Sequence, residues 1–239
     1  MGFGSYTYIE ESYSIGDLDL KEIGGHFGGI LGSTDGNNIN IKNCYNIMDI
    51  KTNSNAGGIA GQVYGGNIEQ CFHIGDISGG GRIGGICGYD EWGDSQIKNC
   101  YNIGKISGTQ LSAGIISGFG ARIFNCYSIG VIKSCKAMIH YNYSKKPMLN
   151  CFARRHDCDS FSDNKVLTNG EILSIMGGSN GEACEVLFDD EFKEEGMITK
   201  LNNLMSIDEE GTVIETPQNV WKIDTEGIND GYPIFTWQE

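Results

Sequence analysis

Short apolar segments recur along the first two thirds of the chain, each bounded by glycine or asparagine. The clearest is Asn99–Ile106, which reads NCYNIGKI, and Asn43–Ile50, Gln70–Ile77 and Asn125–Ile132 are near copies. From one aromatic residue of the pattern to the next, the step is 25 to 32 residues, a period typical of solenoids and other repeat folds. None of these segments is long enough to show a 3.6-residue period, so we expect strands.

In each full repeat a second apolar block follows such a segment, and in two of the three cases it begins with a glycine pair. It is Gly57–Gly61 in one repeat and Gly84–Gly88 in the next, with Ala113–Gly118 in the repeat after that. The cysteine of the first block and the central isoleucine of the second are fifteen residues apart in all three repeats. Three strands per repeat would form one coil of a β-solenoid, in which equivalent residues stack about 4.8 Å apart.

Stacking of equivalent residues predicts ladders that run along the axis of such a rod. The expected inward ladders are Cys44, Cys71, Cys100, Cys126 and Cys151; Ile59, Ile86 and Ile115; and Ile41, Ile68, Ile97 and Ile123. Asn43, Asn99, Asn125 and Asn150 are expected to stack at a corner, with amides bonded to one another along the axis. The aromatic ladder, from Tyr13 to Phe152, could face either way, because a bend after it breaks the alternation.

The predicted fold class is therefore all-β: a right-handed parallel β-helix of about five to six coils over residues 1–160. Right-handedness is expected because parallel crossovers favour it. Residues 161–239 are predicted to form a small α+β cap that covers the open edge of the last coil. Helices are expected over 168–178 and around 196–205, and two closing strands around the turn Asn229-Asp230-Gly231.

The two blocks together resemble the GLUG-type repeats of bacterial cell-surface proteins. A Gly-Gly-aliphatic-x-Gly element, carried here by Gly57–Gly61 and Gly84–Gly88, alternates with an Asn-Cys-Tyr-Asn-like element, carried by Asn43–Asn46 and Asn99–Asn102. Isoleucine replaces the leucine usual in that family, and the repeat from Cys126 departs from the pattern. The resemblance implies a rod used in exported adhesin-like proteins and as a non-catalytic part of some surface proteases, and it supplies no catalytic residue.

The net charge of -14 belongs almost wholly to the last third of the chain. Residues 1–156 hold 13 basic and 12 acidic residues, whereas residues 157–239 hold 4 and 19. Such a field repels phosphate backbones, so nucleic acid is not expected as a partner. No run is long enough to span a bilayer, so membrane insertion is not expected either. Because the first repeat is entered partway, we expect the chain to be part of a larger polypeptide.

Nine cysteines is an odd count, and five of them share one position of the repeat. We expect buried free thiols there, because stacked neighbours rarely have disulfide geometry. Cys151, His156 and Cys158, near Asp159 and Asp163, include metal-ligand types, but their spacing matches no familiar zinc pattern. No metal or cofactor is predicted.

The candidate ligand-contact residues are Asp90, Glu91, Trp92 and Asp94, which lie in one predicted loop. An aromatic ring among carboxylates suits contact with a sugar or a protein, and paired carboxylates also suit a glycosidase. None of the four histidines has a nucleophile at a recognisable spacing. We therefore expect a non-enzymatic structural or adhesive module of a surface-exposed or secreted bacterial protein, whose loops contact a host or bacterial protein or glycan. The alternative is a polysaccharide-degrading enzyme or carbohydrate-binding module.

Overall fold

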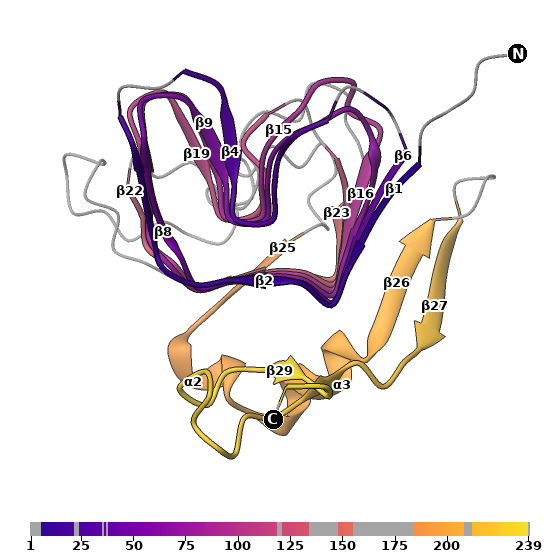
Figure 1. The fold of residues 1–239 in the computed structure, drawn as a ribbon. Helices are drawn as coiled ribbons and strands as arrows, with labels where there is room; N and C mark the ends of the chain where they lie inside the picture. The colour runs from indigo at the N-terminus through magenta and orange to yellow at the C-terminus, as the bar shows by residue number, and fades with distance from the viewer. Residues whose placement is uncertain are drawn as a thin grey trace, which may run out of the picture.

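The computed structural model describes residues 6–21, 24–34, 36, 38–118, 121–133, 148–154, 184–207 and 212–238. Up to residue 154 the described chain winds into a parallel β-solenoid, which Figure 1 shows along its axis. Each full coil contributes one strand to each of five parallel sheets, named A to E here in the order in which a coil visits them. The predicted parallel β-helix is confirmed.

The strands of each sheet are given in chain order. Sheet A contains β1 (Tyr6–Glu10), β6 (Asn38–Lys42), β11 (Gly66–Glu69), β16 (Ser95–Lys98), β20 (Arg122–Phe124) and β23 (Met148–Leu149). Sheet B contains β2 (Tyr13–Ser14), β7 (Tyr45–Asn46), β12 (Phe72–His73), β17 (Tyr101–Asn102), β21 (Tyr127–Ser128), β24 (Cys151–Arg154) and β25 (Cys184–Leu187). Sheet C contains β3 (Asp17–Leu20), β8 (Asp49–Thr52), β13 (Ile77–Gly79), β18 (Ile106–Gly108) and β22 (Ile132–Lys133). Sheet D contains β4 (His26–Gly28), β9 (Asn55–Gly57), β14 (Arg82–Gly84) and β19 (Leu111–Ala113), and sheet E contains β5 (Leu31–Ser33), β10 (Ala60–Val63) and β15 (Cys87–Asp90).

The coils are most regular in the first two thirds of the solenoid. Three coils visit all five sheets, and a fourth reaches sheet E through an isolated bridge between Cys87 and Ile116. A fifth coil retains β20 to β22 and a sixth retains β23 and β24 among the described residues. The expectation of three strands per coil was wrong, because each glycine block folds the chain inward and so adds the strands of sheets D and E.

Sheets D and E line this inward fold, the deep indentation at the top of the coil in Figure 1. Its lowest point touches the inner face of sheet B, the floor of the coil. A Cβ added to Gly58 would lie 2.3 Å from Cγ of His73, and one added to Gly85 would lie 2.5 Å from Cγ of Asn102. The second glycine of each block is therefore needed for close approach of the backbone to the floor.

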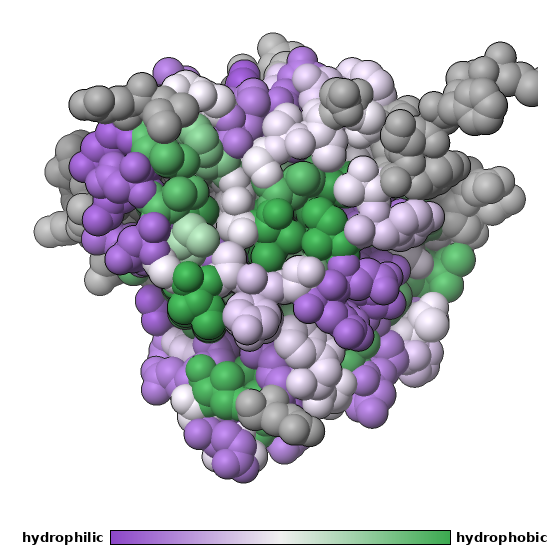
Figure 2. Space-filling view, in the orientation of Figure 1, coloured by the Kyte–Doolittle hydropathy of each residue, from purple (hydrophilic) through white to green (hydrophobic). Residues whose placement is uncertain are grey.

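The inward fold divides the interior into two apolar cores. The first lies between sheets A, B and E and contains the cysteine ladder with Ile59, Ile86 and Ile115 and with Ile41, Ile68, Ile97 and Ile123. The second lies beside sheets C and D and contains Ile50, Ile77, Ile83 and Ile106. On the first coil, Ile9, Leu18 and Phe27 are only partly buried. Figure 2 accordingly shows apolar side chains gathered on the face that the solenoid presents along its axis.

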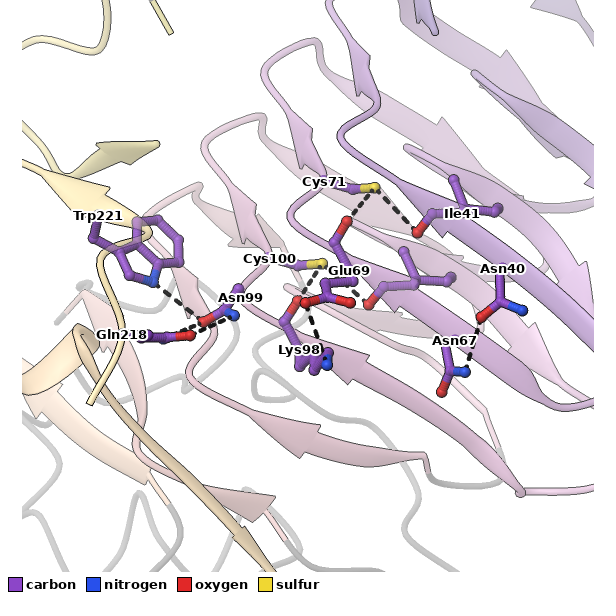
Figure 3. Close-up of polar contacts among 11 residues, drawn as sticks. Asn40, Ile41, Asn67, Glu69, Cys71, Lys98, Asn99, Cys100, Gln218 and Trp221 are labelled. Carbon is purple, nitrogen blue, oxygen red and sulfur yellow. Dashed lines mark hydrogen bonds and ion pairs between the residues drawn. The ribbon is translucent and has the colours of Figure 1, made fainter. Parts of the chain in front are cut away.

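All five thiols of the cysteine ladder are free and buried. Each contacts the carbonyl oxygen two residues earlier, as Cys71 does with Glu69 at 3.2 Å and Cys100 with Lys98 at 3.3 Å (Figure 3). Burial raises the pKa of Cys71 and Cys100 well above the ordinary value, because a thiolate loses its hydration there. The ladder cysteines therefore act as small apolar side chains that fill the core, and we expect their thiols to be unreactive in the folded protein.

We expect a water-soluble thiol reagent to leave the five ladder cysteines unmodified in the folded protein and to modify them all after denaturation. The physical reason is that all five thiols are buried, and a raised pKa, as at Cys71 and Cys100, leaves almost no reactive thiolate at neutral pH. Mass spectrometry of peptides from the labelled protein measures which cysteines react. Rapid native labelling of Cys71 or Cys100 would contradict the inward ladder.

A left-handed residue makes the corner between sheets A and B in every described coil. Its φ is between 49° and 53° at Glu11, Asn43, Gln70, Asn99, Asn125 and Asn150. Asparagine tolerates this conformation better than most residues, which explains its recurrence there. The predicted axial amide ladder is incomplete in the described structure: Asn150 donates to Asn125 at 2.9 Å, but the Asn99 oxygen accepts from Gln218 and Trp221 (Figure 3).

The aromatic ladder points outward from the coil, from the outer face of sheet B. Rings in adjacent coils stack almost parallel, with centroids 4.9 Å apart between Phe72 and Tyr101 and between Tyr101 and Tyr127. The C-terminal segment, residues 184–238, covers this ladder and buries Phe72 through Phe152, whereas Tyr13 of the first coil is 63% exposed. A third apolar core therefore lies outside the solenoid, between sheet B and the C-terminal segment.

The C-terminal segment is built from short elements below the floor of the coil in Figure 1. After β25 they are α2 (Asp189–Phe192), α3 (Glu195–Leu201), β26 (Asn203–Ile207), β27 (Val213–Pro217), β28 (Trp221–Lys222) and β29 (Ile234–Phe235). β26 pairs with β27 and β28 with β29, both antiparallel. The second predicted helix ends at Leu201, before a strand, and the helix predicted over 168–178 lies outside the described residues.

The described part of this segment lies mainly along the side of the solenoid. Among the described residues, β25 alone extends the last coil, by pairing parallel to β24, while α2 and the following elements pack beside sheet B. The reason is the outward aromatic ladder, which needs a cover along its length and not only at one end.

Candidate functional site

The four predicted contact residues lie at the end of β15 and in the turn into β16, but they have different roles. Asp90 is fully buried, and its carboxylate accepts backbone N–H groups of Trp92 at 3.3 Å and of Ser95 at 2.8 Å. Burial raises the pKa of Asp90, because its charged form loses hydration. Asp90 therefore shapes the turn and is not available to a ligand.

Trp92, in contrast, is 54% exposed. Its indole ring meets Tyr64 edge to face, with centroids 5.4 Å apart and an interplanar angle of 82°. Tyr64 belongs to the corresponding turn of the preceding coil, between β10 and β11. Such a T-shaped pair is a favoured aromatic geometry and holds the indole in place while its other surface remains open.

Polar side chains brace this pair on the side of the inward fold. Gln62 Nε2 donates to Glu91 Oε2 at 3.0 Å and to Tyr64 Oη at 3.4 Å, and Ser33 donates to Gln62 Oε1 at 3.2 Å. Three successive coils therefore contribute to one hydrogen-bonded chain. We name the group Gln62, Tyr64, Glu91 and Trp92 the aromatic corner.

Arg82 and Tyr89 meet across the inward fold, since Arg82 belongs to sheet D and Tyr89 to sheet E. The guanidinium carbon of Arg82 lies 4.2 Å from the centroid of the Tyr89 ring, a cation–π contact. Burial and a hydrogen bond with Glu91 raise the pKa of Tyr89 above its ordinary value. A cation thus lies next to the aromatic corner, in the same coil as Glu91.

Sequence reasoning placed Trp92 and Glu91 correctly in one exposed turn, but it missed Gln62 and Tyr64. The repeat could have indicated them. Val63 pairs with Asp90 in register, so the residues next to Val63 lie beside the residues next to Asp90 in the following coil. Asp94 was predicted as a contact through its side chain. The structure shows its backbone oxygen accepting a hydrogen bond from Arg122 Nη2 at 3.3 Å.

Two of the three candidate carboxylates are already engaged within the protein. Asp90 is buried with both oxygens accepting hydrogen bonds, and Glu91 accepts a hydrogen bond from Gln62. A retaining or inverting enzyme needs two carboxyl groups that face one open space. What the corner offers is an exposed aromatic surface framed by hydrogen-bonding groups.

A second group of polar side chains is buried inside the solenoid, beneath the inward fold. Asn46, His73, Asn102 and Ser128 occupy equivalent positions of the floor in four coils. Asn46 Nδ2 lies 3.0 Å from His73 Nδ1, and Asn102 donates to Ser128 at 3.3 Å. The buried Nε2 of His73 has no hydrogen-bond partner within the described parts of the chain. This ladder is closed to solvent, so we assign it to structure and not to chemistry.

His73 should make the protein sensitive to acid. Burial lowers its pKa from 6.5 to about 4, because the fold has no room for a hydrated imidazolium. The unfolded chain binds the proton near pH 6.5 and the folded chain only near pH 4. The contribution to stability is therefore complete above pH 6.5 and is lost as pH falls towards 4.

Between pH 7.5 and 4.5 we expect this loss to reach about 2 to 3 kcal/mol of unfolding free energy. His73→Asn places the residue of the neighbouring coils at this position and should remove that share of the pH dependence. Urea denaturation of both proteins at the two pH values measures the difference. The assignment fails if His73→Asn and the unsubstituted protein lose the same free energy on acidification.

The residues that the structure describes contain no group of three His, Cys, Asp or Glu side chains placed to hold a metal ion. Of the predicted metal-ligand types, Cys151 lies in the cysteine ladder. The others, His156, Cys158, Asp159 and Asp163, lie outside the described residues. No helix among the described residues has the length and apolar character needed to cross a bilayer.

Comparison with known proteins adds one structural likeness. No protein-family model matches the chain, and no curated protein matches it. A crystal structure of a candidate immunoglobulin A1 protease from Bacteroides ovatus is similar over 97% of this chain, with 23% sequence identity and a TM-score of 0.50. This chain spans 58% of that protein's chain. At this identity the likeness concerns the fold alone, and it places the chain among β-solenoid structures.

Proposed function

We propose that this chain is a non-enzymatic binding module that contacts glycans through the aromatic corner. The observation that carries the proposal is the Trp92 ring, which is 54% exposed and is held edge-on by Tyr64. Apolar faces of sugar rings pack on such aromatic surfaces, while nearby polar side chains bond to the hydroxyl groups. Glu91 supplies such a polar group, and the buried Gln62 of the adjacent coil holds it in place, so the rod itself sets its position.

A rigid support is what makes this arrangement effective. Axial hydrogen bonds between coils fix the two turns that carry Tyr64 and Trp92, so little conformational entropy is lost when a ligand binds. The resemblance of the repeats to those of cell-surface proteins supports placement on the outside of a bacterium, as part of a larger exported polypeptide. The name of the Bacteroides ovatus neighbour refers to an antibody protease, which is compatible with a solenoid carried by a larger surface enzyme.

The test is a glycan array probed with the full chain, followed by titration of each bound glycan. We expect Trp92→Ala to weaken binding about tenfold or more, because it removes the stacking surface. Trp237→Ala, which removes a tryptophan that is 36% exposed beside the aromatic ladder, is the matched control and should leave the affinity unchanged. Binding that is equally tight in Trp92→Ala would refute the assignment of the corner.

The alternative, a polysaccharide-degrading enzyme, is tested in the same experiment by incubating the chain with neutral and acidic polysaccharides. Release of oligosaccharides that depends on Glu91 would establish catalysis and overturn the non-enzymatic proposal. We expect no release, because Asp90 cannot reach a substrate.

A further inference from the structure

The outer face of sheet A carries a row of side chains beside the aromatic corner, at one position in five successive coils. Backbone register aligns Tyr8, Asn40, Asn67, Gln96 and Arg122. Tyr8 is 65% exposed, Asn67 and Arg122 are exposed, and Asn40 and Gln96 are half-buried. We name these five residues the amide row.

Three of these positions carry amides, although asparagine is disfavoured in strands. Asn67 Nδ2 donates to Asn40 Oδ1 at 2.9 Å, which aligns the two side chains along the axis (Figure 3). Among the described residues, this bond leaves the Nδ2 of Asn40 and the Oδ1 of Asn67 facing outward without a protein partner. An amide presents a donor and an acceptor together, which is the combination that pairs of sugar hydroxyls require.

The amide row is continuous with the aromatic corner. Arg122, at one end of the row, donates to the backbone oxygen of Asp94, two residues after Trp92. Asn67 follows Tyr64 by three residues at the start of β11. The other end of the row is closed by the exposed aromatic ring of Tyr8, a second surface suited to stacking. Coils lie about 4.8 Å apart, close to the length that one pyranose ring adds to an extended chain.

We propose that the amide row binds a linear polysaccharide laid along the solenoid axis, with successive sugar rings over successive coils. This inference rests on the proposed function and specifies its ligand: an extended chain of several rings, not a terminal sugar. The aromatic corner binds one part of the chain, and the amide row binds the rings that continue along the rod.

The experiment titrates the full chain with β-1,4-linked gluco-, N-acetylgluco- and galacturono-oligosaccharides of increasing length. For the series that binds, we expect affinity to rise with each ring until the row is filled. Asn67→Ala and Gln96→Ala should each weaken binding of long oligosaccharides about fivefold to tenfold, the value of one or two hydrogen bonds. Both should leave binding of the shortest oligosaccharide unchanged, whereas Trp92→Ala weakens short and long ligands alike.

Asn53→Ala is the matched control, because it removes an exposed amide on a different side of the coil. Affinity that depends on Trp92 but not on oligosaccharide length, Asn67 or Gln96 would overturn the amide row and leave the proposed function standing. Failure of all three series to bind would overturn both. Far-ultraviolet circular dichroism of each variant excludes loss of folding as the cause of weaker binding.

Discussion

Gly85→Ala is expected to destabilise the protein by at least about 3 kcal/mol. A Cβ at this position would lie 2.1 Å from the carbonyl oxygen of Gly114 and 2.5 Å from Cγ of Asn102. The carbonyl belongs to the backbone of the next coil, so it can move only if the axial hydrogen bonds of the inward fold are broken. One methyl group would therefore separate the inward fold from the floor over more than one coil.

Denaturant unfolding of the purified variant measures this loss. Gly196→Ala is the matched control, because a Cβ there meets nothing within 4 Å and the residue lies in α3. Alanine favours helix over glycine, so the control should be neutral or slightly stabilising, by up to about 1 kcal/mol. A Gly85→Ala protein within 1 kcal/mol of the parent would show that the inward fold does not rest on the floor as closely as described.

Trp221→Ala is expected to release much of the C-terminal segment from the solenoid, at a cost of about 3 to 5 kcal/mol. Trp221 is 1% exposed, and its ring centroid lies 5.6 Å from that of Tyr127 and 4.5 Å from that of Phe235. Its Nε1 also donates to Asn99 at 3.3 Å, at the left-handed corner of the coil. Trp221 therefore contacts the aromatic ladder, the left-handed corner at Asn99 and the closing strand β29. Alanine at this position would leave a cavity between these three groups.

Hydrogen exchange of the floor strands and limited proteolysis of the C-terminal segment measure the release. We expect residues 184–238 to be cleaved much faster in Trp221→Ala, while the parallel strands of the solenoid keep their protection. Trp237→Ala, at the half-open end of the same ladder, should cost about 1 kcal/mol and leave proteolysis nearly unchanged. Equal effects of the two substitutions, or simultaneous loss of the solenoid, would contradict a separate outer core.

The candidate site was predictable only in part, and Asp90 and Trp92 show why. A turn between two strands, rich in acids and with a tryptophan, was correctly read as surface-exposed. Whether a given carboxylate faces solvent or its own turn depends on local backbone direction, which no repeat pattern encodes. Tyr64 and Gln62 could not be predicted as part of the site from their own coil. Their role depends on contacts with Trp92 and Glu91 of the next coil.

The sequence by itself determined the repeat length, the β-strand character of the repeats and the residues that stack. A buried ladder position is visited once per coil, so Cys71, Ile86 and their equivalents had to recur in every full repeat for the core to be continuous. Only the tertiary structure decided that each coil folds inward, that the aromatic ladder faces out, and that the C-terminal segment lies along the side. The physical reason is that all three depend on contacts between segments far apart in the chain: glycine against the floor, and Trp221 against Tyr127. Periodicity reports which residues are equivalent, but the direction in which they point is set by what packs against them.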